Sequence, residues 1–404
     1  MKRPLEDIRV LDLSRVYAAP AGTMILGDLG AEVIRIESLK GSDSMREWGP
    51  FVNGESTYYF SANRNKRSIT LDLKTEKGKE VFLYLVKKAD VIVENFKTGT
   101  MERLGLEYDY LKTINDQIIM CSVTGFGQTG PYKTYPGFDP VIQAMSGLMD
   151  VTGPKDGEAT KVGVPIADIL TSNYVALSIL AAIRMRDFNQ VGQHIDLSLL
   201  DVQLSNLANV SSSFLNTGVL AKRLGNSHNN VVPYQVFYCK DHPIMLCAGN
   251  NGLFMKLCDV LGHSEWKTDP RYVTNEKRMD NEDELVEKIG EIIKRKTADE
   301  WLALFSDAKI PAGKVNTVDQ AFDDPQVKAR EGVEILQHPT IGEIKMTKSP
   351  LRFSGLNIQS EYAPPLLGEH TEEVLLEIGY SEEEVMELKE NDIIGGKVDK
   401  ILDR

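Results

Sequence analysis

Asp168 is the side chain whose surroundings in the sequence best suit nucleophilic chemistry. It is the only carboxylate between Lys161 and Arg186, and apolar residues flank it. Apolar residues then recur at helical spacing without Pro or Gly, so Asp168 is expected near the first turn of a mostly buried helix. There it would accept backbone N–H groups, stay ionised and serve as a nucleophile. Asp is also a preferred helix N-cap, and the stretch taken alone favours that structural role.

Basic side chains in the first half of the chain fall near predicted strand ends, where a cluster could bind phosphate groups. They are Arg64, Lys66, Arg67, Lys74, Lys97, Arg103 and Lys133. The net charge of the chain is −13, so an anionic ligand needs a local cluster of this kind. Ordinary solvated Lys and Arg side chains are the alternative, and the two interpretations stay open.

Two short stretches are further candidates for a ligand site. Asn95–Lys97 ends a predicted strand just before a helix, whose first backbone N–H groups suit a pyrophosphate. Gly137–Asp139 ends the Gly/Pro-rich loop 124–139, and a loop at a strand end of an open α/β sheet is where ligands usually bind. An Asx turn is an equally good role for Asp139.

The elements that must position these residues alternate between strand and helix. Strands are predicted at 8–13, 31–37, 68–73, 90–96 and 117–123, with an irregular polar segment at 38–67. Helical patterns lie between the strands, which predicts a parallel sheet with helices on both faces. After the Asp168 helix, the sequence predicts one more strand and a long helix within 191–216.

The length of 404 residues predicts two domains. The polar stretch 218–233 marks a boundary between them. The patterns beyond it predict a hairpin at 234–249, helices at 253–261, 283–294 and 298–307, β structure at 333–355, and two acidic amphipathic helices within 369–392.

Composition and missing motifs exclude several classes of protein. The acidic balance argues against a nucleic-acid partner. There is no G-x-G-x-x-G after the first strand and no H-E-x-x-H, Walker A or G-x-S-x-G, and the six scattered His indicate no metal site. The four Cys show no C-x-x-C spacing, which favours reduced thiols in a cytoplasm. The N-terminus does not read as a signal peptide, and no clean apolar run is long enough for a membrane span.

The sequence resembles the family III CoA-transferases, the group of formyl-CoA transferase and carnitine CoA-transferase. The likeness covers nearly the whole chain, and it rests on VLDLSRVYAAPAGTMILGDLGAEVIRIE, NRNKRSITLDLKTEKGKE, DVIVENFKTGTMERLGL, VGVPIADIL and PPLLGEHTEEVL. GQHIDLSLLD and GNSHNNVVPYQVF add to it. Any one of these stretches is a weak signal, whereas together they are specific.

The resemblance implies a fold and an assembly. The fold is α/β, with a Rossmann-like parallel sheet in a large CoA-binding domain and a smaller α+β domain. The large domain would comprise residues 1–217 and a C-terminal return at 326–404, and the small domain with its linkers would be 218–325. Two subunits would form an interlocked homodimer, with no nucleic acid or membrane as partner.

The resemblance also implies a reaction and a set of site residues. CoA would pass from an acyl-CoA thioester to a free carboxylic acid through an aspartyl mixed anhydride and an aspartyl-CoA thioester on Asp168. No cofactor would be bound permanently, since coenzyme A is itself a substrate. Val16 and Tyr17 would lie near the thiol end. The implied CoA contacts are Leu71, Asp72, Leu73, Lys74, Asn95, Phe96, Lys97 and Arg103.

Two alternatives share this fold. The related α-methylacyl-CoA racemases carry a His where Phe138 stands and a Glu near Asn250, and neither Phe nor Asn carries a proton at neutral pH, so racemisation is disfavoured. The second alternative is a non-catalytic CoA-binding subunit, and the intact sequence around Asp168 disfavours it. Tyr17 and Ser38 stand where some members carry Gln and Arg, and the poly-Gly loop of formyl-CoA transferase is absent, so neither oxalate nor formate is indicated as a substrate.

Overall fold

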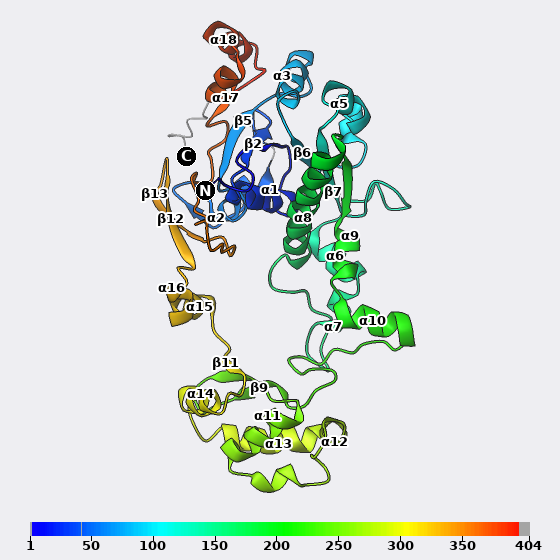
Figure 1. Cartoon of the computed structure of the whole chain (residues 1–404), viewed down its shortest axis with the longest axis vertical. Helices are drawn as coiled ribbons and strands as arrows, with labels where there is room; N and C mark the ends of the chain where they lie inside the picture. The colour runs from blue at the N-terminus through cyan, green and yellow to red at the C-terminus, as the bar shows by residue number, and fades with distance from the viewer. Residues whose placement is uncertain (1, 42, 396–404) are drawn as a thin grey trace. The chain divides into compact units, whose positions relative to one another are not determined.

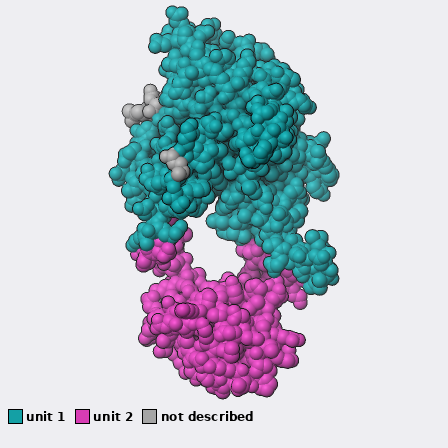
Figure 2. Space-filling model, viewed as in Figure 1, with its two compact units in different colours: residues 1–148, 161–219, 328–404 teal, residues 149–160, 220–327 magenta. Residues whose placement is uncertain are grey.

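The computed structural model describes residues 2–41 and 43–395, which form two compact units (Figure 2). Unit 1 comprises residues 1–148, 161–219 and 328–404, and unit 2 comprises 149–160 and 220–327. Residues 149–160 thus group with unit 2, whereas the sequence predicts them in the large domain. Of the predicted C-terminal return, residues 396–404 lie outside the described part of the chain.

Unit 1 is built on a six-stranded sheet in the order β5-β2-β1-β6-β7-β8, with every neighbouring pair parallel (Figure 1). The strands are β1 (Arg9–Asp12), β2 (Glu32–Glu37), β5 (Lys66–Thr70), β6 (Val91–Glu94), β7 (Ile119–Thr124) and β8 (His194–Ser198). The central strands are apolar runs buried on both faces, which is the pattern of a parallel sheet covered on both sides. The predicted α/β class is confirmed.

Helices cover both faces of this sheet. On one face, apolar side chains of the sheet share a core with α3 (Glu76–Val86), α4 (Thr100–Leu104), α5 (Tyr108–Ile114), α17 (Thr371–Ile378) and α18 (Glu382–Glu390). On the other face, the core is shared with α1 (Ala18–Asp28) and α8 (Ile166–Asn189). The C-terminal helices therefore complete the first core.

Helix α8 holds the predicted nucleophile and packs closely on α1. A Cβ at Gly22 would lie only 2.6 Å from the Cβ of Val175, so a glycine is needed where the two helices cross. In length and composition α8 is the one described helix that would suffice to cross a membrane, a property it shares with core helices of soluble proteins.

The predicted boundaries are wrong in two places in unit 1. The segment 38–67 is not irregular throughout, because it contains η1 (Ser44–Glu47), β3 (Phe51–Val52), β4 (Glu55–Ser56) and α2 (Thr57–Phe60), and β5 begins at Lys66. The single long helix predicted before 216 is two helices, α9 (Leu199–Ser205) and α10 (Ala208–Thr217). The break falls at Asn206, whose side-chain amide donates to the Val202 carbonyl and closes the end of α9.

The remaining elements of unit 1 are short. They are α6 (Asp139–Met145) and the hairpin of β12 (Val333–His338) and β13 (Gly342–Thr347), and α7 (Leu148–Val151) begins at the last residue of the first segment of unit 1 and continues into unit 2. The hairpin packs apolar side chains against α2 in a small separate core.

Unit 2 has its own core under a three-stranded antiparallel sheet in the order β11-β10-β9. Its strands are β9 (Tyr234–Tyr238), β10 (Pro243–Cys247) and β11 (Ala312–Lys314), so the predicted hairpin is confirmed. Its helices are α11 (Asn251–Leu261), η2 (Ser264–Lys267), α12 (Asn275–Asp280), α13 (Glu282–Ile293), α14 (Ala298–Asp307) and α15 (Val318–Asp323), with α16 (Pro325–Ala329) at its limit.

Candidate active site

A cavity of about 570 Å³ lies at the carboxyl edge of the parallel sheet. Residues just beyond the ends of all six strands line it, and Asp168 of α8 reaches it from the covering layer. The chain leaves β1 toward β2 and later returns to β6 on the other side of β1, so a topological switch point lies between β1 and β6. Such a point is where open α/β sheets bind ligands.

The two turns at the switch point are tied together. The Arg15 backbone N–H donates to the Asn95 side-chain oxygen at 2.8 Å, and the Asn95 amide donates back to the Arg15 carbonyl at 2.8 Å. The Arg15 guanidinium lies over the Phe96 ring, 4.9 Å from its centroid. The turn after β1 and the turn after β6 therefore form one rigid wall of the cavity.

Val16 lies two residues before α1 and has a left-handed backbone conformation with φ of 62°, which is strained for a β-branched residue. Asp43 holds it there, because its Oδ1 accepts from the Val16 N–H and the Met45 N–H, each at 3.0 Å. The other oxygen of Asp43 accepts from Arg35. The hydrogen bonds of Asp43 therefore hold in place the backbone that brings Val16 and Tyr17 to the cavity.

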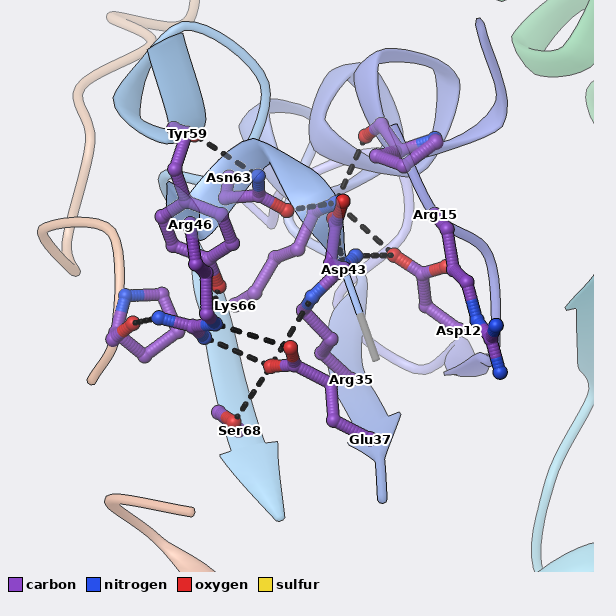
Figure 3. A network of polar contacts seen from close by, with 12 residues as sticks. Asp12, Arg15, Arg35, Glu37, Asp43, Arg46, Tyr59, Asn63, Lys66 and Ser68 are labelled. Atoms are coloured by element: carbon purple, nitrogen blue, oxygen red, sulfur yellow. Dashed lines mark hydrogen bonds and ion pairs between the residues drawn. The ribbon is translucent and has the colours of Figure 1, made fainter. Parts of the chain in front are cut away.

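Asp43 belongs to a buried network of charged side chains (Figure 3). Arg35 is fully buried among Asp12, Glu37 and Asp43. The Lys66 ammonium donates to Asp12 at 2.9 Å, to the Pro20 carbonyl at 2.8 Å and to Asn63 at 3.0 Å. Burial lowers the pKa of Lys66 to about 8, although Asp12 opposes it. Burial would raise the pKa of Asp12, but Lys66 and Arg35 outweigh it and lower that pKa to about 2.

The interpretation of the basic residues as one phosphate-binding cluster is therefore wrong for three of the seven. Lys66 is enclosed in this network. Arg64 is buried against Asp28, with Nε and Nη2 donating to its two oxygens at 2.9 and 2.6 Å. Arg67 donates to Glu373 and Glu377 of α17, each at 2.8 to 2.9 Å. These side chains join the sheet to its flanking segments and are not available to a ligand.

Three other lysines are available. Lys74, Lys97 and Lys133 line the cavity with exposed side chains, and none forms an ion pair with a described residue. Arg103 is not among the lining residues, and its guanidinium donates to the Thr100 hydroxyl at 2.6 Å.

The loop that leaves β7 is pinched at its base. A Cβ on Gly125 would lie 2.6 Å from the Cα of Gly137, so only glycines allow the two ends of this loop to meet. Both glycines line the cavity, as does Phe138, whose side chain is 61% exposed. Asp139, the first residue of α6, lies behind this wall and is not a lining residue.

Asp168 is the third residue of α8 and is not its cap. The N-cap position is Pro165, which has no capping side chain. Asp139 supplies the cap instead: its Oδ1 accepts from the backbone N–H groups of Ala167 at 2.7 Å and Asp168 at 3.4 Å. The expectation that Asp168 itself accepts backbone N–H groups is wrong, because Asp139 occupies that role.

The charge state expected for Asp168 also needs correction. Burial first, and then the nearby Asp139 carboxylate, raise the pKa of Asp168 to about 7. Tyr17 and Tyr58 face the same carboxylate, with ring centroids 6.3 Å apart in an edge-to-face pair. The carboxylate of Asp168 is therefore more basic than that of an ordinary Asp.

The racemase alternative finds no acid–base pair in this cavity. No histidine is among its lining residues. Phe138 takes no part in proton transfer. Asp139 accepts at both oxygens, from α8 and from the Gln143 amide at 2.7 Å, and is not among the lining residues.

Twelve of the predicted site residues come together in the lining of the cavity, and Arg103 and Asp139 do not. The twelve are Val16, Tyr17, Leu71, Asp72, Leu73, Lys74, Asn95, Phe96, Lys97, Gly137, Phe138 and Asp168. The prediction missed residues that also line it, among them Leu13, Arg15, Glu37, Ser38, Thr98, Thr124, Tyr135 and Leu199. Several of them directly follow a strand, and this position in the sequence is the signal that could have identified them.

An open parallel sheet with a partly buried carboxylate and exposed lysines at its switch point is the arrangement of an α/β protein that binds an anionic ligand. The model of CoA-transferase family III matches residues 5–371, so the chain belongs to that family. It is an acyl-CoA:carboxylate CoA-transferase, and its substrates are CoA thioesters and carboxylic acids. The resemblance read from the sequence is confirmed.

Relatives and solved structures agree with this assignment. The chain is 40% identical over 377 residues to succinyl-CoA:glutarate CoA-transferase of Homo sapiens, covering 93% of this chain and 86% of the relative. It is 42% identical over 386 residues to succinate–glutarate CoA-transferase of Agrobacterium fabrum, covering 93% and 96%. A crystal structure of a CaiB/BaiF family protein from Brucella suis superposes with a TM-score of 0.84 at 40% identity, covering 94% of this chain and 100% of that one.

Proposed function

We propose that this transferase carries CoA through covalent intermediates on Asp168. The observation that carries the proposal is the freedom of this carboxylate. Glu37 and Asp72 also line the cavity, but Glu37 is paired with Arg35 and Arg46, and Asp72 accepts from a backbone N–H. Among the described residues, the Asp168 carboxylate has neither an ion-pair partner nor a hydrogen-bond donor, so its oxygens are free to attack.

The steps balance without an external cofactor. An Asp168 oxygen attacks the thioester carbonyl, the C–S bond breaks, and CoA leaves as the thiolate, which gives a mixed anhydride. The thiolate attacks the aspartyl carbonyl and expels the donor acid as a carboxylate, which gives an aspartyl-CoA thioester. The acceptor carboxylate then reverses both steps. The partial burial of Asp168 supports this sequence, because water would hydrolyse either intermediate.

Coenzyme A would lie across the cavity with its phosphates toward the exposed lysines. Lys74, Lys97 and Lys133 supply unpaired positive charge at the rim. The fixed turn at Val16 and Tyr17 supports placement of the thiol end beside Asp168, since Tyr17 and Asp168 are close enough to interact electrostatically. Arg103, outside the lining, would play a smaller part.

The acceptor would be a dicarboxylic acid. The names of related transferases include glutarate, oxalate, D-citramalate and mesaconate as acids, and several name succinyl-CoA as the donor. A mass-spectrometric screen of succinyl-CoA against mono- and dicarboxylic acids tests this class. Transfer to monocarboxylic acids alone would contradict it.

The enzyme would act as a homodimer in the cytoplasm. Support for a second copy comes from large apolar side chains exposed on α8 and α10, which a lone subunit rarely leaves in water. They include Leu177, Phe188, Phe214 and Leu215. The four described cysteines are free thiols, as a reducing compartment favours. Sedimentation equilibrium tests the dimer, and a monomer at micromolar concentration would contradict it.

The direct genetic test of the proposed function replaces Asp168 with Asn. Asp168→Asn keeps the size of the side chain but removes the nucleophile, so transfer should fall by orders of magnitude while the melting temperature stays close to that of wild type. Asp187→Asn is the matched control, because Asp187 lies exposed near the far end of the same helix. Retained transfer in Asp168→Asn would contradict the proposal.

A further inference from the structure

We propose that Asp139 is a positioning residue for the transfer reaction: through its cap on α8 it fixes the Asp168 backbone, and through its charge it raises the reactivity of the Asp168 carboxylate. The inference rests on the proposed role of Asp168 as nucleophile. It gives a function to a side chain that lies outside the cavity lining.

Both carboxylate oxygens of Asp139 accept hydrogen bonds from groups of the protein. The side chain is 7% exposed. One oxygen accepts from the Ala167 and Asp168 backbone N–H groups, and the other accepts from the Gln143 amide at 2.7 Å. Each of these three groups donates to Asp139, which is the environment of an ionised carboxylate.

Gln143 extends this arrangement away from the cavity. It is fully buried, and its amide oxygen accepts from the Val162 N–H at 2.9 Å. The Val162 contact fixes which end of the amide faces Asp139, so the NH2 group must donate to the carboxylate. Asp139 and Gln143 therefore connect α6 to the first turn of α8 and to the irregular segment that leads into it.

A cap alone does not require a negative charge at this position. Ser, Thr or Asn would accept from the same backbone N–H groups. An ionised Asp places a second carboxylate beside Asp168 in a poorly solvated site, where repulsion between like charges is strong. That repulsion opposes stability of the unreacted enzyme, so the charge calls for a functional explanation.

The reaction itself supplies one. When Asp168 becomes an anhydride or a thioester it loses its charge, and its repulsion from Asp139 disappears. Asp139 therefore destabilises free ionised Asp168 relative to the covalent intermediates. It also makes the Asp168 oxygens more basic, in line with a pKa raised to about 7 by burial and then by Asp139. The other titratable groups that face Asp168 are Tyr17 and Tyr58, whose pKa values are raised, so both are neutral at pH 7.

The experiment moves the charge while keeping the hydrogen bonds. In the double variant Asp139→Asn with Gln143→Glu, the new amide oxygen still accepts from the α8 N–H groups, and its NH2 donates to the new carboxylate. That carboxylate still accepts from the Val162 N–H, one helical turn farther along α6. Single-turnover acylation by saturating acyl-CoA is measured against pH, together with the melting temperature.

We expect the acid limb of the profile to move to lower pH and the rate at alkaline pH to fall, with the melting temperature nearly unchanged. The ratio of the rate at about pH 5.5 to that at about pH 8.5 should rise about tenfold, the effect of a pKa lower by about one unit. An unchanged ratio in the folded double variant would overturn the proposal and leave Asp139 as a structural cap.

Two controls separate the possible causes of failure. If the double variant does not fold, Asp139→Thr keeps a capping oxygen without the charge, and the same change in the ratio is expected. Trapping of the wild-type intermediate tests the proposed function independently: without an adduct on Asp168 the proposed function fails, whereas an adduct with an unmoved pH profile rejects only the role of Asp139.

Discussion

Lys66 and Lys97 are both basic residues near strand ends of the same sheet, yet the structure predicts opposite consequences when each is replaced by Met. Lys66 is fully buried, and its ammonium donates three hydrogen bonds, to Asp12, the Pro20 carbonyl and Asn63. Lys66→Met leaves Asp12 buried without this partner. Breaking one side of a buried ion pair costs about 3–5 kcal/mol, a large part of the stability of a typical domain.

Lys97 is exposed at the rim of the cavity and has no ion pair with a described residue. Lys97→Met should leave the free energy of unfolding within about 0.5 kcal/mol of wild type. If it contacts a phosphate of CoA, the lost charge-assisted bond is worth about 1.5–3 kcal/mol, which weakens binding about 10- to 150-fold.

Urea unfolding and calorimetric titration with CoA measure the two effects on each variant. We expect Lys66→Met to lower the unfolding midpoint without weakening CoA binding in the protein that remains folded. We expect Lys97→Met to weaken CoA binding without lowering the unfolding midpoint. A stable Lys66→Met enzyme with weakened CoA binding would refute the distinction between buried network and ligand-binding cations.

Three further outcomes follow from the site. Burial and then Asp139 raise the pKa of Asp168 to about 7, so protonation at lower pH removes the nucleophile. The rate of single-turnover acylation should therefore fall about tenfold per pH unit below about pH 6. A rate that stays constant down to about pH 5 would count against this. Asp43→Ala removes the acceptor that holds the strained Val16 backbone and one ion-pair partner of buried Arg35. Urea unfolding should therefore show a free energy of unfolding lower by about 3–5 kcal/mol, and an unchanged unfolding midpoint would contradict this. Arg103→Ala should weaken CoA binding less than Lys97→Met in calorimetry, and the opposite order would return Arg103 to the site.

The sheet and the position of the site follow from local sequence patterns. Short apolar runs such as Val91–Val93 alternate with amphipathic helices, so their parallel pairing is predictable. Leu71–Lys74 and Asn95–Lys97, which the family resemblance implies as CoA contacts, follow two strands of this sheet, and both line the cavity.

The partners of buried charges could not be predicted, because they depend on contacts between distant segments. Nothing near Arg64 in the sequence indicates Asp28, and nothing near Lys66 indicates Asp12. The cap of α8 is similar: Asp139 lies 28 residues before Ala167 and comes from another helix. An Asp near a predicted helix start is consistent with a cap, and only the fold shows that a different Asp does the capping.

The covalent role of Asp168 is tested most directly by trapping its intermediate. The enzyme is incubated with acyl-CoA without an acceptor acid, hydroxylamine is added, and the digested protein is mapped by peptide mass spectrometry. Hydroxylamine attacks an aspartyl-CoA thioester at its carbonyl, expels CoA and leaves a hydroxamate on the side chain. The account predicts this hydroxamate on Asp168 in wild type and its absence in Asp168→Asn. A hydroxamate on another carboxylate, or full transfer activity in Asp168→Asn, would contradict it.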